Sequence, residues 1–215
     1  MTYPRMPRVS LHVFSSVFAL FLFTQTAHSQ IQFGVIGGAN FASLNEIQAN
    51  GSLVSFDNAT AFHAGAFLDI GLGPLSIRPA AYYLNAGALF KGASFLSEDA
   101  FDVTYVTIPV DINFSIGVGG FKPYVFAGPE FRLLNATDAP LALEEDLQSF
   151  TMGASAGLGV AISLPFSGLT FYPHIRYSFG LTDFTSRTYE VQGVSIDTGG
   201  DARVNVWMLS LGVGF

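Results

Sequence analysis

Apolar and polar residues alternate along most of the chain with the two-residue period that is typical of β-strands. In the segment 102–116, for example, Val106, Ile108 and Val110 alternate with Thr107 and Asp111. The same period predicts eight strands, near 31–44, 60–72, 75–90, 102–116, 122–135, 149–164, 169–182 and 203–215. The pattern therefore predicts an all-β chain in which each strand has one polar face and one apolar face.

The connections between these strands are alternately short and long. Three are tight turns, around Gly73, Gly119 and Ser167. Four are long and polar, at roughly 45–59, 91–101, 136–148 and 183–202. In an up-and-down transmembrane barrel with both termini in the periplasm, the short turns lie on the periplasmic side and the long loops lie outside. We therefore expect an eight-stranded antiparallel up-and-down transmembrane β-barrel with a closed lumen.

The composition supports a membrane barrel over a soluble one. Only 12% of the residues are charged, while 50% are apolar, and the mean hydropathy is +0.43. A soluble domain of this size needs more charge on its surface, and a helical membrane protein needs runs of roughly 18 apolar residues, which the chain after residue 29 lacks. The polar strand faces are rich in Gly and Ser and poor in Lys and Glu, so we expect them to line the lumen while the apolar faces contact lipid.

The first residues resemble a bacterial export signal. Arg5 and Arg8 precede an apolar stretch at 11–23, and Ala27 to Ser29 has the small-x-small pattern that signal peptidase cleaves. An uncleaved membrane anchor is the alternative, but about 13 apolar residues span only about 20 Å as a helix, less than the hydrocarbon core. We therefore expect a signal peptide at 1–29, a barrel domain at 30–215, and location in the bacterial outer membrane.

The net charge and the last strand indicate which macromolecules the chain can bind. After cleavage the chain would hold seven basic and 16 acidic residues, so it has no basic patch for nucleic acid. The last strand ends at Phe215, with Trp207, Leu209, Leu211 and Val213 on the same face. A terminal aromatic residue after alternating apolar residues resembles the signal that the barrel-assembly machinery reads, although an ordinary last strand is the alternative.

The inferred lumen face carries an unusual set of ionisable residues. We expect a lumen charge network made of His63, Asp69, Arg78, Asp111, Glu130, Arg132, His174 and Arg176. Buried charges must be paired, because each unpaired charge costs several kcal/mol, and eight strands enclose an interior just wide enough for side chains. We therefore expect the network to plug the barrel; a gated path for protons or ions is the alternative.

No pattern for catalysis, a cofactor or a metal is present. The chain has no Cys, no GxSxG and no HExxH, so we predict no catalytic, cofactor-binding or metal-ligating residues and no enzymatic activity. A lipid-modifying enzyme that uses His63 near the outer rim remains the alternative. Three acidic groups could bind Ca²⁺ or bridge lipopolysaccharide through divalent ions, but none has the EF-hand order. They are Glu98-Asp99 with Asp102, Glu144-Glu145-Asp146, and Asp197 with Asp201.

Five prolines lie inside predicted strands, where proline removes a donor from the hydrogen-bonded ladder. They are Pro79, Pro109, Pro123, Pro129 and Pro173. We expect Pro109 to mark a local bulge or bend.

Four segments of the chain form a recognisable series: FGVIGGANFASL at 33–44, YVTIPV at 105–110, GVGGFKPYVFAGPEF at 117–131 and the closing LSLGVGF. Together they resemble the PorT-like outer-membrane β-barrel proteins of the Bacteroidetes and their relatives. The resemblance covers nearly all of 30–215 and implies an eight-stranded outer-membrane barrel. It implies little about activity, because most members of that family have no assigned function.

These observations favour a non-enzymatic barrel that supports envelope structure or interacts at the cell surface through its long loops. In the loop 183–202, Tyr189, Val191, Val194 and Ile196 alternate with polar residues, so we expect the flanking strands to extend outward as a hairpin whose edge accepts a partner strand. Expected partners are outer-membrane lipid and lipopolysaccharide, the barrel-assembly machinery, and a surface or periplasmic protein. An accessory role in a secretion machine is a further alternative.

Overall fold

A computed structural model describes most of the chain after residue 29. The described residues are 30–44, 47–49, 52–54, 59–88, 102–117, 119–137, 148–183, 188–191, 194–197 and 203–215. The expected signal peptide and the acidic runs at 98–99 and 144–146 lie outside these ranges. Within them, no helix is long and apolar enough to cross a membrane.

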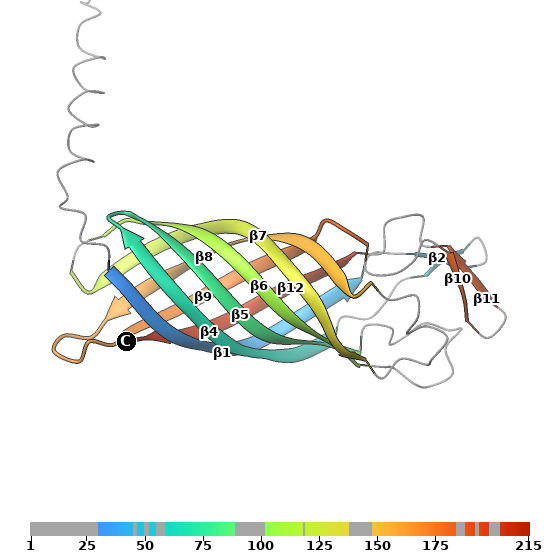
Figure 1. Ribbon diagram of the computed structural model, residues 1–215, viewed down its shortest axis with the longest axis horizontal. Helices are drawn as coiled ribbons and strands as arrows, with labels where there is room; N and C mark the ends of the chain where they lie inside the picture. The colour runs from blue at the N-terminus through green and yellow to red at the C-terminus, as the bar shows by residue number, and fades with distance from the viewer. Residues whose placement is uncertain are drawn as a thin grey trace, which may run out of the picture.

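Eight long strands form one closed barrel, in which every neighbouring pair is antiparallel (Figure 1). The strands are β1 (Gln30–Leu44), β4 (Ala59–Leu72), β5 (Leu75–Ala88), β6 (Asp102–Ser115), β7 (Phe121–Thr137), β8 (Phe150–Ser163), β9 (Thr170–Gly180) and β12 (Val204–Gly214). Neighbours in sequence are neighbours in the barrel, and β1 pairs with β12 to close it. The predicted fold and number of barrel strands are confirmed.

The two faces of the strands differ as the alternation predicts. On β6, Thr107, Asp111 and Asn113 are buried, while Ile112 and Phe114 are exposed. On β12, Trp207, Leu209 and Leu211 are each at least half exposed. Large apolar side chains therefore cover the outside, where only a hydrocarbon phase would accommodate them without a large free-energy cost.

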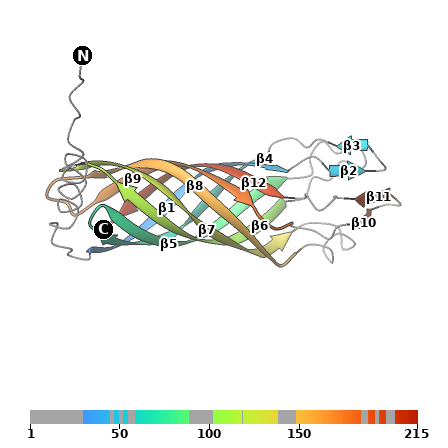
Figure 2. The same ribbon diagram turned by 90° about the horizontal axis from the view of Figure 1, so that it is seen from above.

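The two ends of the barrel are different. The short turns lie at one end together with the C-terminus, and the long connections leave from the other end (Figures 1 and 2). Gly73 and Gly119 both have φ of +72° in these turns, a conformation that residues with a Cβ rarely adopt. By the rule for outer-membrane barrels, the turn end is periplasmic and the other end is extracellular.

A second, smaller sheet lies beyond the extracellular end of the barrel (Figure 2). It contains β2 (Ile47–Ala49), β3 (Ser52–Val54), β10 (Thr188–Val191) and β11 (Val194–Asp197) in the order β10-β11-β2-β3. We refer to it as the extracellular sheet. Its two hairpins come from the connections that follow β1 and precede β12, and these connections leave the barrel side by side because β1 pairs with β12.

The extracellular sheet corrects one detail of the sequence-based prediction. A hairpin does form at 188–197, but it does not extend β9 and β12, because it belongs to the separate sheet and pairs with β2. The β2–β3 hairpin was missed inside the expected loop 45–59. The dipeptide Asn50-Gly51 between these two strands is a strong sequence signal for a tight hairpin and could have revealed it.

The strand prolines interrupt the ladders without shifting the register. Next to Pro109, pairing between β6 and β7 resumes in the same register at Ile112↔Ala127. The register shifts that do occur in this region lie between Asn85 and Ala88 on β5 and between Thr104 and Tyr105 on β6. Of the bulge or bend expected at Pro109, the bulge is absent from the register, because the loss of one N–H donor leaves the flanking ladder pairs in place; the bend stays a prediction.

Aromatic rings on the inner face pack directly over glycines of neighbouring strands. A Cβ added at Gly157 would lie 2.3 Å from the Phe126 ring, and one at Gly159 would lie 2.7 Å from the Tyr124 ring. The β7–β8 register places these residues opposite each other. The missing Cβ atoms thus make room for the rings inside a narrow barrel.

Candidate functional site

The eight ionisable residues expected in the lumen all belong to barrel strands and are largely hidden from solvent. They lie on β4 (His63, Asp69), β5 (Arg78), β6 (Asp111), β7 (Glu130, Arg132) and β9 (His174, Arg176). Seven are buried, and Asp69 is the most accessible, with 14% of its side chain exposed. We call this set the interior network. Each of its arginines forms an ion pair with one of its carboxylates.

The first ion pair lies nearest the extracellular end. Arg132 Nε is 2.7 Å from Glu130 Oε1, and its Nη2 donates to Ser178 Oγ at 2.6 Å. Ser178 in turn donates to the same Glu130 oxygen. Nη1 of Arg132 donates to the backbone oxygen of Val204 at 2.9 Å. The guanidinium thereby joins β7 to β9 and β12 across the interior.

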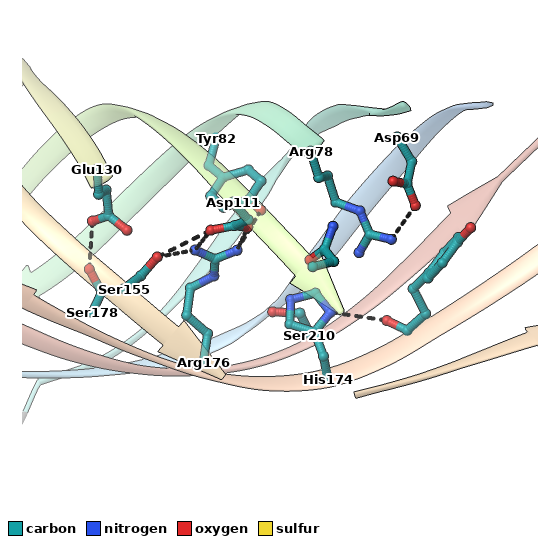
Figure 3. Close-up of polar contacts among 12 residues, drawn as sticks. Asp69, Arg78, Tyr82, Asp111, Glu130, Ser155, His174, Arg176, Ser178 and Ser210 are labelled. Carbon is teal, nitrogen blue, oxygen red and sulfur yellow. Dashed lines mark hydrogen bonds and ion pairs between the residues drawn. The ribbon is translucent and has the colours of Figure 1, made fainter. Parts of the chain in front are cut away.

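The central pair has the strongest geometry. Arg176 uses both terminal nitrogens on Asp111, with distances of 2.5 Å to Oδ2 and 3.1 Å to Oδ1. Two-pronged pairs of this kind are among the strongest charge-assisted contacts in proteins. Ser155 Oγ accepts from Arg176 at 2.6 Å, and the Tyr82 hydroxyl lies 3.4 Å from its other terminal nitrogen. Figure 3 shows the Ser155 hydroxyl in contact with both Arg176 and Asp111.

The third pair lies nearest the periplasmic turns and is surrounded by aromatic rings. Arg78 Nη2 is 2.5 Å from Asp69 Oδ2. The centre of its guanidinium lies 4.4 Å from the Tyr172 ring, 5.1 Å from Phe67 and 5.2 Å from Tyr124. Cations placed over aromatic faces within about 6 Å are stabilised further when water is excluded. This end of the interior is therefore filled by one arginine and three rings.

The two histidines lie between the second and third pairs. His63 Nε2 and Ser210 Oγ are 2.9 Å apart, which is the separation of a nucleophile and its base. However, His63 Nδ1 has no hydrogen-bond partner among the described groups, so no carboxylate orients the ring as it does in catalytic triads. His174 Nδ1 contacts the backbone oxygen of Tyr172 at 3.1 Å. Each ring therefore makes one hydrogen-bond contact in the interior, and its other nitrogen, His63 Nδ1 or His174 Nε2, has no partner among the described groups.

The sequence-based prediction omitted the polar residues that complete the network. Ser155, Ser178, Ser210 and Tyr82 each bond to a predicted network residue and are themselves buried. The sequence signal that could have identified them is their position on the inward-facing side of the alternating strands. Within the part of the chain that the structure describes, no group of three or more His, Asp or Glu could hold a metal ion.

The charge of the network is balanced while that of the extracellular end is not. Three arginines face three carboxylates inside the barrel. The four long connections, 45–58, 89–101, 138–149 and 181–203, hold 12 acidic and three basic residues, a net charge of −9. Chemically, the interior can hold the strands together, and the exterior can attract cations.

An apolar exterior, a closed antiparallel barrel and a packed polar interior define a small bacterial outer-membrane β-barrel protein. A family model described as "Outer membrane protein beta-barrel domain" matches residues 23–186, and the chain belongs to this family. The protein is located in the bacterial outer membrane.

Solved structures that are similar to this chain are distant from it in sequence. Neisserial surface protein A is 13% identical, with a TM-score of 0.50, and the match covers 85% of this chain and 95% of that one. Escherichia coli outer membrane protein W is 19% identical over 87% of this chain and 100% of that one, with a TM-score of 0.47. The N-terminal barrel of Pseudomonas aeruginosa OprF is 16% identical over 86% and 98%, with a TM-score of 0.41. No curated protein sequence matches the chain.

Proposed function

We propose that this protein is a non-enzymatic outer-membrane barrel whose packed interior makes it a rigid support and whose extracellular connections contact a partner at the cell surface. The observation that carries the proposal is the interior network. Its three ion pairs occupy successive levels along the barrel, and the level next to the periplasmic turns is also closed by Phe67, Tyr124 and Tyr172. A barrel filled in this way favours a supporting role over permeation.

Conductance measurements test the closed interior. The purified chain in a planar lipid bilayer should show no large, steady conductance, because the ion pairs and rings block the axis. A stable channel of porin size would overturn this part of the proposal. Deleting residues 185–200 should leave the bilayer result unchanged, since that segment lies in the extracellular connection between β9 and β12.

The rival role as a lipid-modifying enzyme is disfavoured by the position of His63. Only 1% of this residue is exposed, and its ring bonds inward to Ser210, whereas a lipid substrate would approach from the outer face. Mass spectrometry of lipid A from cells with and without the protein tests this directly. A mass change that depends on His63 would favour the enzyme.

We also propose that the chain is a PorT-like member of its family and that the mature protein begins at Gln30. The first proposal is supported by YVTIPV at 105–110 and by the Pro-Tyr opening of the next strand at 123–124. The second is supported by the small-x-small pattern that ends at Ser29. N-terminal sequencing of protein purified from outer membranes should yield Gln30-Ile31-Gln32, and a sequence that starts at Met1 would contradict it.

We further propose that Phe215 contributes to recognition by the barrel-assembly machinery. The residue is 59% exposed, and its ring packs edge-on against Phe33 with 5.3 Å between the ring centres. Its N–H donates to the backbone oxygen of Phe33. Replacing it by Ala should reduce the amount of protein that reaches the outer membrane. Refolding of the same variant from urea into detergent should be nearly normal, because no assembly machinery is needed there.

A further inference from the structure

The extracellular sheet has two outer edges, β10 and β3, with no further described strand beside either of them. Such edges present unpaired backbone N–H and C=O groups and can accept another strand. Native proteins often block an edge with Pro or Lys, and the β10 sequence, Thr-Tyr-Glu-Val, contains neither. With four residues, β10 is also the longer of the two edges, since β3 has three.

The β10–β11 register indicates which backbone groups face outward. Residues 192 and 193 connect the strands, and Val191 is opposite Val194. In a hairpin with a two-residue connection, the two residues of the closing pair form both backbone hydrogen bonds with each other. Along the strands, hydrogen-bonded pairs then alternate with non-hydrogen-bonded pairs. Tyr189 therefore continues the ladder with Ile196, while the backbone N–H and C=O of Thr188 and Glu190 point to the free side of β10.

The negative charge of the extracellular end indicates which kind of strand can bind at the free edge of β10. Its connections carry a net charge of −9, so a second copy of the chain, with the same charge, would be repelled at close range. A basic segment would be attracted, and its approach would be faster at low salt. We propose that the free edge of β10 binds an extended, lysine- or arginine-rich segment of another protein, which adds to the extracellular sheet as a fifth strand. This inference rests on the proposed surface role and names the class of partner.

A peptide of alternating Lys and Val, eight residues long with blocked ends, is a suitable probe. It should bind the full mature chain in detergent micelles. A version with an N-methyl group on every residue, equal in charge, should bind about tenfold more weakly, because neither of its edges can donate to the carbonyl groups of Thr188 and Glu190, a loss of about two backbone hydrogen bonds. A Glu–Val peptide should not bind. Equal binding of the methylated and unmethylated peptides would mean attraction by charge alone and would overturn the proposal.

Edge variants locate the site. Glu190→Pro removes an outward N–H of β10 and should weaken binding of the Lys–Val peptide about tenfold. The matched variant Leu53→Pro, on the outer strand β3, should leave binding unchanged. Glu190→Gln separates the loss of the charge from the loss of the N–H and should weaken binding less than Glu190→Pro. If Leu53→Pro weakened peptide binding more than Glu190→Pro did, the site would lie on β3, and the proposal would be contradicted.

Disulfide trapping keeps the test valid if a Pro variant disturbs its hairpin. The chain has no Cys, so Glu190→Cys and Leu53→Cys each introduce a single thiol. A Lys–Val peptide whose terminal Cys carries a thiopyridyl group as a mixed disulfide should exchange with the introduced thiol and release thiopyridone. This exchange should be faster at position 190 than at position 53, and equal rates would contradict the proposal. If the peptide fails to bind while the chain still shows no steady conductance in the planar bilayer, the proposed class of partner is wrong and the proposed supporting role of the barrel is unaffected.

Discussion

The interior of the barrel and the extracellular sheet are built in opposite ways. The interior is neutral overall, and its charged side chains are paired at distances of 2.5 to 2.7 Å between strands held by long ladders. The extracellular sheet has strands of three and four residues, and the two connections that carry it, 45–58 and 181–203, hold six acidic and two basic residues. The contrast teaches that the same chain uses charge for cohesion where water is excluded and for attraction where water is present.

The largest expected effect comes from breaking the central ion pair. Asp111→Ala leaves Arg176 buried without its carboxylate, so the free energy of unfolding should fall by about 3–5 kcal/mol. Urea titration in detergent, followed by the heat-modifiable shift on gels, measures this. The double variant Asp111→Leu with Arg176→Met is the control and should recover much of the loss, because no buried charge remains. An unchanged stability for Asp111→Ala would show that the network does not hold the barrel together.

A smaller effect is expected from filling the space under an interior ring. In Gly157→Ala the new Cβ would lie 2.3 Å from both the Phe126 ring and the backbone oxygen of Ile175, and overpacking of this kind costs about 1–3 kcal/mol. The matched control is Ala156→Leu, one residue away on the exposed outer face, which should change the unfolding free energy little. Equal effects for the two variants would contradict the close packing of the interior.

Loss of a charge at the rim of the barrel should change the free energy of unfolding only slightly. Arg203 and Asp183 lie 3.6 Å apart, with 39% and 32% of their side chains exposed, and exposed pairs contribute about 0–1 kcal/mol. Asp183→Asn should therefore lower the unfolding free energy by less than about 1 kcal/mol. The same urea titration measures it, and a loss as large as that of Asp111→Ala would remove the distinction between interior and rim.

Removing the extracellular hairpin should have no measurable effect on the barrel. Residues 185–200 contain β10 and β11, which pair with each other and with β2 but with no barrel strand. The deletion variant should keep the full heat-modifiable shift and resist protease like the intact chain. Failure to fold would show that the extracellular sheet supports the barrel.

Protease added to intact cells tests the orientation on which the comparison rests. Cleavage should occur only in the four long connections, because the short turns lie in the periplasm. Efficient cleavage at Gly119 would invert the topology and move the acidic connections to the periplasmic side.

The sequence by itself determined the barrel and its faces. The two-residue alternation assigns each barrel residue to one face, and the alternately short and long connections indicate an up-and-down order. The eight barrel strands and the inward position of the eight network residues could therefore be predicted, whereas the β2–β3 hairpin was not. The signal was local, which is why it was readable without the structure.

Only the tertiary structure decided which charges pair. In the register, Arg78 is directly opposite Asp111, yet Arg78 pairs with Asp69, and Asp111 pairs with Arg176 across the interior from β9. The extracellular sheet was likewise decided at this level, because β2 and β11 come from connections about 150 residues apart and meet only where β1 and β12 close the barrel. Contacts across a closed barrel depend on the tilt and stagger of all its strands, and no local pattern in the sequence encodes these.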